Sequence, residues 1–130
     1  MIVGIGIDIV DIERVNRLLD RYKDRFVKRV FTEEEEKYAY RSIKPAERLA
    51  GRFAVKEAFM KAIGTGKSNG ILWRDVETVR GPLGRPKVKL YGKANKYMNM
   101  LNGNNVHVSI THDGGKAIAF VVIERAGEAG

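Results

Sequence analysis

The chain has 130 residues, of which 44% are hydrophobic and 31% are charged, and it contains no cysteine. This balance is typical of one soluble globular domain and excludes a disordered chain, while the lack of cysteine excludes disulfides and thiolate metal sites and favours a reducing cytoplasm. No apolar run approaches the ~20 residues of a membrane span, and the net charge of +8 favours acidic partners such as nucleic acid, an anionic cofactor or an acidic protein.

Residues 2–10 have the alternation of a β-strand. Isoleucine occupies the odd positions from 5 to 9, whereas two glycines and Asp8 occupy the even positions from 4 to 8. Residues 11–30 then follow helical spacing. Their apolar stripe consists of Val15, Leu18, Leu19, Tyr22, Phe26 and Val30. The first 30 residues therefore predict a strand followed by one helix.

The later segments begin and end at recognisable signals. Thr32 and Glu35 have the spacing of a capping box, so we expect a short helix from there to about Arg41. Pro45 suits the start of the next helix, which we expect over 46–63. Further along, the pattern predicts strands over 72–79 and 87–91, a short helix over 92–101, and a hairpin of 106–112 with 116–124.

These elements predict one α+β domain over residues 1–125, followed by a flexible tail at 126–130. No internal repeat or linker divides the chain. We expect a small antiparallel sheet packed by helices, with a long central helix that carries a metal ligand.

Two carboxylates interrupt otherwise apolar segments. Asp8 lies in the first strand, where the two glycines on its own face would leave space for a bulky group; a water-exposed strand end is the ordinary alternative. Glu57 lies four residues before Lys61 on the long helix, and a surface ion pair is the ordinary interpretation there. Together, Asp8 and Glu57 would suit Mg²⁺, which takes its other ligands from water and substrate phosphates. With two histidines in the chain, a zinc or iron site is disfavoured.

A polar strand face is predicted within residues 106–112. Alternation places His107, Ser109 and Thr111 on one face, with His112 at the strand end. Such a face is most often exposed to solvent, but hydroxyl and imidazole groups also suit a phosphate or the edge of a nucleobase.

Basic side chains form a stripe on the first predicted helix. Residues 14–29 include seven basic and two acidic residues, so this window carries +5 of the total charge of +8. A charge run is usually a solvated face, yet one sign at helical spacing also suits docking of an acidic surface. No standard nucleotide-binding motif or nucleophile elbow is present.

Three segments, in this order, resemble the signatures of one enzyme family. They are GIGIDIV at 4–10, GRFAVKEAFMKA at 51–62 and VHVSITH at 106–112, and the middle one is the most specific. In order and spacing they resemble the holo-acyl-carrier-protein synthases, the short bacterial type of phosphopantetheinyl transferase. The resemblance covers nearly the whole chain.

The resemblance implies a role for each matching residue. Asp8 and Glu57 would be the Mg²⁺ ligands, and Lys61 would complete the catalytic set by contacting the transferred phosphate or the leaving group. The residues that would hold coenzyme A are Arg52, Phe53, Gly64, Pro86, Ser109, Thr111 and His112. The residues that would meet the acidic recognition helix of the carrier protein are Arg14, Arg21 and Arg25. The short members of the family are homotrimers, so the sites would lie between subunits.

The implied reaction is a phosphoryl transfer that serves fatty acid biosynthesis. A serine hydroxyl of apo-acyl carrier protein attacks the pyrophosphate of coenzyme A, and adenosine 3′,5′-bisphosphate leaves. Positioning, and neutralisation of charge by Mg²⁺ and Lys61, would accelerate such a reaction. Either Glu57 or a water on the metal would accept the proton of the serine.

Two other functions stay compatible with the residues alone. A basic nucleic-acid-binding module fits the charge, although aromatic residues are few and no groove-reading helix pair is evident. A metal-dependent nucleotide hydrolase would use the same carboxylates but would not need a basic docking helix. The resemblance instead favours apo-acyl carrier protein and coenzyme A as partners, so we expect neither nucleic acid nor a membrane as a partner.

Overall fold

The computed structural model describes residues 1–127. The strands β1 (Ile2–Asp11), β5 (Lys116–Glu124) and β4 (Asn105–Asp113) form a three-stranded antiparallel sheet in the order β1-β5-β4. The strands β2 (Val76–Arg80) and β3 (Pro86–Leu90) form a separate antiparallel hairpin. The predicted α+β class is confirmed, with the antiparallel strands divided between two sheets.

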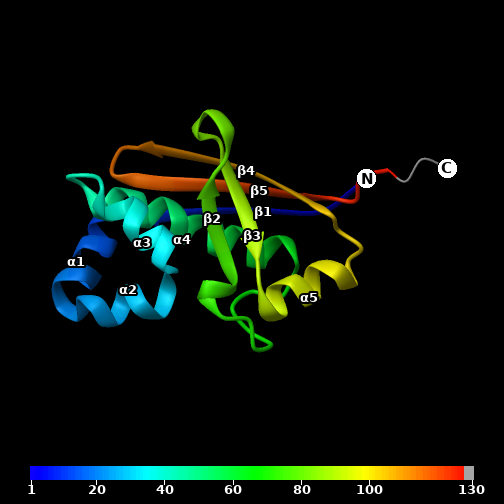
Figure 1. Ribbon diagram of the computed structural model, residues 1–130, viewed down its shortest axis with the longest axis horizontal. Coiled ribbons are helices and arrows are strands. Elements are labelled where there is room, and N and C mark those ends of the chain that lie inside the picture. The colour runs from blue at the N-terminus through cyan, green and yellow to red at the C-terminus, as the bar shows by residue number, and fades with distance from the viewer. Residues whose placement is uncertain (128–130) are drawn as a thin grey trace.

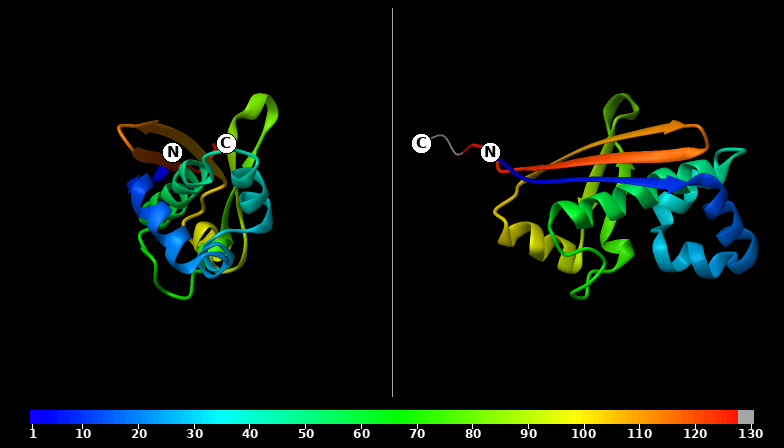
Figure 2. Two further views of the ribbon diagram at one scale, coloured as in Figure 1. Left: turned by 90° about the vertical axis from the view of Figure 1, so that its left-hand side faces the viewer. Right: turned by 180° about the vertical axis from the view of Figure 1, so that it is seen from behind.

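The helices lie on one face of the three-stranded sheet (Figures 1 and 2). The longest, α4 (Pro45–Ala62), runs along β1 and β5. At one end of the molecule lie α1 (Ile12–Tyr22), α2 (Asp24–Val30) and α3 (Glu33–Tyr40), and at the other end lies α5 (Gly92–Met100). Two single-turn 3₁₀ helices, η1 (Trp73–Asp75) and η2 (Pro82–Gly84), flank β2. None of the helices in residues 1–127 is long and apolar enough to cross a membrane.

Close packing of α4 on β1 accounts for the glycines of the first strand. A Cβ at Gly4 would overlap the carbonyl of Ala62, and a Cβ at Gly6 would overlap the carbonyl of Ala58. The helix backbone therefore occupies the space beside these glycines. The expectation that they leave space for a bulky group beside Asp8 is wrong, because their role is to let α4 approach the sheet.

Two of the predicted elements differ from the structure. The single helix expected over 11–30 is broken at Lys23, which has a positive φ of 49° and donates its N–H to the Leu19 carbonyl at 2.9 Å. The strand expected from residue 72 begins at Val76, because residues 73–75 form the turn η1. The other predicted boundaries lie within two residues of the observed ones. Of the predicted tail at 126–130, residues 128–130 lie outside the described residues, and Ala126 donates its N–H to Asn104 Oδ1 at 2.7 Å.

A buried ion pair joins α4 to α3 and β2. Lys56 and Glu35 are both fully buried, and Lys56 Nζ lies 2.7 Å from Glu35 Oε1. Lys56 also donates to the carbonyls of Trp73 at 3.0 Å and Val76 at 2.5 Å, and Glu35 Oε2 accepts the Thr78 N–H at 2.9 Å. Burial lowers the pKa of Lys56, and the Glu35 carboxylate opposes that shift. This network fixes the position of α4 at Lys56, the residue directly before Glu57.

The sheet face opposite α4 is apolar and open. Ile5, Ile7 and Ile9 on β1 are 56–57% exposed, and Phe120 on β5 is 42% exposed. The register places Ile7 opposite Phe120, and Phe120 opposite Ser109 of β4. The polar strand face predicted on β4 therefore borders this apolar surface.

Candidate active site

The end of α4 and the edge strand β1 bring Lys61 and Asp8 together. Lys61 Nζ donates to Asp8 Oδ1 at 2.8 Å and to the Ile7 carbonyl at 3.1 Å. The Asp8 side chain is 10% exposed and the Lys61 side chain is 56% exposed, so the pair opens to solvent on the lysine side. The second oxygen, Asp8 Oδ2, is buried and has no hydrogen-bond partner within residues 1–127.

Glu57 lies beside Asp8 and completes the cluster. Two causes raise the pKa of Glu57 to about 7: partial burial, which is the larger, and the neighbouring Asp8 carboxylate. Arg14 and Lys61 oppose the shift. Burial and a neighbouring carboxylate both favour the neutral, protonated form of a carboxyl group. The sequence prediction that Asp8, Glu57 and Lys61 come together is therefore realised in the geometry.

The cluster has the donor chemistry of a magnesium site. Asp8 Oδ2 is a buried oxygen without a hydrogen-bond partner among residues 1–127, and burial together with the Asp8 carboxylate raises the pKa of Glu57 despite the nearby Lys61 and Arg14. Within residues 1–127 no three Asp, Glu or His side chains converge to form a complete metal cage. Two carboxylates with open positions are what Mg²⁺ uses when phosphate oxygens and water supply its other ligands.

Arg52 lies on α4 with its side chain almost fully buried. Its guanidinium stacks on the Tyr38 ring at 3.8 Å, and Arg48 stacks on the same ring at 4.1 Å. The Nε of Arg52 is buried without a partner among the described residues, and burial lowers the pKa of the side chain. Arg52 also lines a cavity of about 620 Å³ whose other basic lining residues are Arg41, Arg80, Lys87 and Lys89. The cavity is thus suited to an anion.

Other residues predicted to hold coenzyme A lie on several surfaces. Pro86 and Ser109 line one groove of about 600 Å³ between β3 and β4. His112 Nε2 lies 3.1 Å from the Glu47 carbonyl, next to the first turns of α4, and Thr111 is exposed on the open sheet face. Gly64, with a φ of +83°, starts the exposed loop after α4.

Phe53 is different, because its side chain is part of the core. It is 7% exposed and makes edge contacts with Phe26, Phe31 and Trp73, with ring centroids 5.1–6.5 Å apart. This packing accounts for Phe53 without a ligand.

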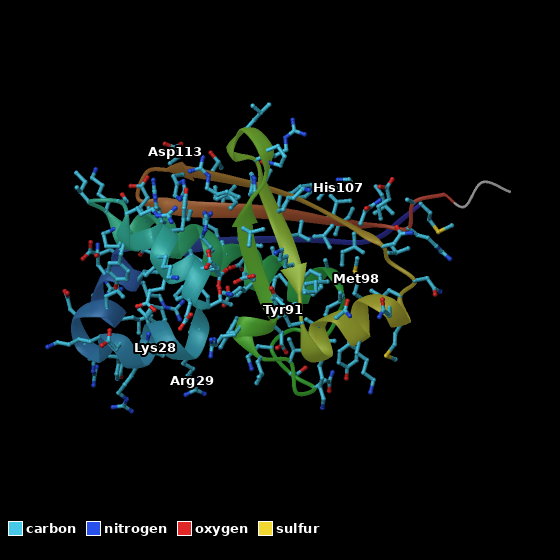
Figure 3. The ribbon with its side chains drawn as sticks, in the orientation of Figure 1. Lys28, Arg29, Tyr91, Met98, His107 and Asp113 are labelled. Carbon is cyan, nitrogen blue, oxygen red and sulfur yellow. The ribbon has the colours of Figure 1, made fainter. Side chains whose placement is uncertain are left out.

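The basic stripe is exposed on α1 and α2. Arg14, Arg21 and Arg25 are all exposed, and none of them forms an ion pair within residues 1–127. Figure 3 shows Lys28 and Arg29 on the same end of the molecule, where they project from α2. Arg14 lies close enough to Glu57 to lower its pKa, so the stripe reaches the carboxylate cluster.

Comparison with known proteins identifies the family. Residues 4–120 match the model of the 4′-phosphopantetheinyl transferase superfamily. The chain belongs to this superfamily. Among curated relatives, it is 46% identical over 125 residues to the holo-[acyl-carrier-protein] synthase of Geobacter metallireducens, covering 96% of this chain and 99% of the relative. It is 48% identical to the synthase of the same name from Methylobacterium nodulans, covering 95% and 97%.

Solved structures agree with this assignment to the superfamily. The holo-[acyl-carrier-protein] synthase of Neisseria meningitidis superposes with a TM-score of 0.87 at 35% identity, covering 95% of this chain and 99% of that one. The Helicobacter pylori synthase in complex with coenzyme A superposes with a TM-score of 0.81 at 32% identity, covering 92% and 99%. The family resemblance inferred from the three sequence segments is therefore confirmed.

The surroundings of Arg52 and the partner of Lys56 were not predicted from the sequence. Tyr38 and Arg80 come from α3 and β2, far from Arg52 in sequence, and nothing local links them. The four-residue spacing of Arg48 and Arg52 was the available signal, since it places both on one helix face.

Proposed function

We propose that this member of the superfamily transfers the phosphopantetheine arm of coenzyme A to a serine of apo-acyl carrier protein, with Mg²⁺ as cofactor and adenosine 3′,5′-bisphosphate as the second product. The observation that carries the proposal is the cluster of Asp8, Glu57 and Lys61, in which two carboxylates and a lysine meet at an open edge of the sheet. The names of the relatives and the coenzyme A complex of the Helicobacter pylori synthase support this substrate pair.

Asp8 and Glu57 would hold the metal ion. When bound, Mg²⁺ supplies charge neutralisation on the pyrophosphate oxygens. The burial of Asp8 fixes its carboxylate, and Lys61 keeps its own ammonium at the same opening through its bonds to Asp8 and the Ile7 carbonyl. Lys61 is thus placed to contact the transferred phosphate or the departing one.

The basic cavity beside Arg52 supports a phosphate-rich substrate. Four further basic side chains line it, and only two acids, Glu34 and Glu77, accompany them. Glu77 is already engaged by the hydroxyls of Thr32 and Tyr91. The nearby groove with Pro86 and Ser109 gives the remaining part of coenzyme A a second surface.

The stripe on α1 and α2 would dock the carrier protein. The arginines of the stripe are exposed, and Arg14 at one end of the stripe lies near Glu57. An acidic helix bound to the stripe would therefore present its serine near Asp8, Glu57 and Lys61. Attraction between opposite charges speeds such encounters and weakens as salt is added.

The open sheet face would be a subunit interface of a homotrimer. Three isoleucines and Phe120 form an apolar surface beside Asp8, so a neighbouring subunit would cover the edge where the cluster opens. Sedimentation of the wild type and of an Ile5→Asp variant tests this: the variant should sediment as a monomer. The cytoplasmic location and the role in fatty acid biosynthesis stay predictions.

Mass spectrometry of apo-acyl carrier protein tests the proposed transfer. With the enzyme, coenzyme A and Mg²⁺, the carrier should gain the mass of one phosphopantetheine group. A chelator or the Asp8→Asn variant should abolish the gain. The Asp11→Asn variant should retain it, because Asp11 is a half-exposed carboxylate on the same strand that pairs with Lys116 at 3.8 Å. A nucleotide hydrolase or a nucleic-acid-binding module would produce no gain, and that result would refute the proposal.

A further inference from the structure

The sequence contains two Asn–Gly pairs, Asn69–Gly70 and Asn102–Gly103. In such a pair the backbone nitrogen of the second residue can attack the side-chain carbonyl carbon, Cγ, of the asparagine. Glycine favours this attack because it has no Cβ to obstruct the approach. The two pairs are identical in sequence, so any difference in their reactivity must come from the fold.

Asn69 and Gly70 are the two central residues of an exposed turn. The Ile71 N–H donates to the Ser68 carbonyl at 3.3 Å and closes the turn. Asn69 has a φ of 59° and Gly70 a φ of 80°, and both residues are exposed. In a turn of this kind the N–H of the third residue has no partner within the turn. The Gly70 N–H accordingly has no acceptor within residues 1–127, which leaves its nitrogen accessible.

A lysine side chain lies against the same glycine. A Cβ placed on Gly70 would be 2.6 Å from Lys93 Nζ. The attack requires the Gly70 nitrogen to lose its proton, and a nearby ammonium stabilises the negative charge that develops there. Lys93 therefore favours the reaction at this pair.

Asn102 and Gly103 sit in the C-terminal cap of α5 and are held in place. The Gly103 N–H donates to the Met98 carbonyl at 3.1 Å, and the Asn102 N–H donates to the Asn99 carbonyl at 2.9 Å. Gly103 is buried, with Met98 and Ile123 packed against it. The nitrogen that would attack is thus occupied and enclosed.

We propose that Asn69 is a site of spontaneous deamidation and that the fold protects Asn102. The Gly70 nitrogen forms a bond to Asn69 Cγ and loses its proton, the bond from Cγ to Nδ2 breaks, and ammonia leaves. Water then opens the resulting succinimide at either carbonyl, giving aspartate or isoaspartate. The product adds one negative charge to the loop that follows α4 and contains Lys67, and the reaction requires no substrate of the enzyme.

Peptide mapping of the wild-type protein, incubated at neutral pH, tests the proposal. The peptide containing Asn69 should gain about 1 Da. The rate should exceed that of the Asn102 peptide by at least about tenfold, because the protected site must first open locally. In concentrated urea the two rates should converge. A Lys93→Gln variant should slow the reaction at Asn69 without changing that at Asn102.

Two results would overturn the proposal. One is equal rates at the two asparagines in the folded protein, and the other is an Asn69 peptide that stays unmodified in the folded protein but reacts in urea. An Asn69→Ser variant identifies the modified residue, since its peptide should show no mass gain.

Discussion

Two lysines of α4 are each paired with a carboxylate, and the two pairs differ in burial and in the contacts of their remaining polar atoms. Lys56 and Glu35 are fully buried, and between them they satisfy two backbone carbonyls and a backbone N–H. Lys61 and Asp8 are at nearly the same separation, 2.8 Å against 2.7 Å. However, the Lys61 side chain is 56% exposed, and Asp8 Oδ2 has no partner within the described residues.

The distance within an ion pair therefore does not reveal its role. The Lys56 pair is closed, because every charge is met by the protein, and it ties α3, α4 and β2 together. The Lys61 pair is open, because Asp8 and Glu57 bring more negative charge than Lys61 offsets, and solvent or a ligand can reach it. We therefore expect the closed Lys56–Glu35 pair to stabilise the fold and the open Lys61–Asp8 pair to take part in the reaction.

Breaking the closed pair should have the largest effect on stability. Lys56→Met leaves the Glu35 carboxylate buried without its cation, which should lower the free energy of unfolding by ~3–5 kcal/mol. Urea denaturation measures the loss. The double variant Lys56→Met/Glu35→Gln should recover part of it, because no buried charge is then left unpaired. A loss under ~1 kcal/mol in the single variant would contradict the assignment of Lys56.

Removing charge from the basic stripe on α1 and α2 should have an intermediate effect on the proposed transfer reaction. The Arg21→Ala/Arg25→Ala variant should raise the KM for the carrier protein by about tenfold at low salt. The KM for coenzyme A should stay unchanged. Lys96→Ala is the control, because Lys96 is an exposed cation on α5 at the opposite end of the molecule. An equal rise in the control would show that only net charge matters.

The titration of Glu57 should have the smallest effect of the three, and it should change the free energy of unfolding. Its folded-state pKa of about 7 lies above the ordinary value of 4.5, so the folded protein binds the proton more tightly than the unfolded chain does. In a chelator, the free energy of unfolding should therefore fall as pH rises from below 4.5 to above 7. Solvent screening limits the fall to roughly 1 kcal/mol. Urea denaturation of Glu57→Gln should show no such fall; the same slope in that variant would assign it to another group.

The sequence could predict what depends on local pattern. The capping box of Thr32 and Glu35 is present, with the Thr32 N–H bonded to Glu35 Oε1 at 3.0 Å, and α4 begins at Pro45 as expected. The family resemblance of three segments, and not the spacing alone, was what predicted that Asp8, Glu57 and Lys61 would form one site, and the structure brings the three side chains together.

Features that depend on contacts distant in sequence could not be predicted. Glu35 also pairs with Lys56, 21 residues away, and nothing in the local sequence of either helix indicates this partner. The glycines of β1 were assigned to a ligand because the sequence does not show that α4 packs there. The break between α1 and α2 at Lys23 could not be predicted, because no proline or glycine lies near it in the sequence.

The comparison of the two ion pairs is tested most directly by the Lys61→Met variant. Its rate of phosphopantetheine transfer and its free energy of unfolding are both measured. The same substitution is then made at both lysines of α4. At Lys61 the transfer rate should fall by at least ~10²-fold, since a charge at the reacting phosphates is removed. Its free energy of unfolding should change by less than ~1 kcal/mol. A Lys61→Met enzyme that retains the wild-type rate would contradict the assignment of chemistry to the open pair.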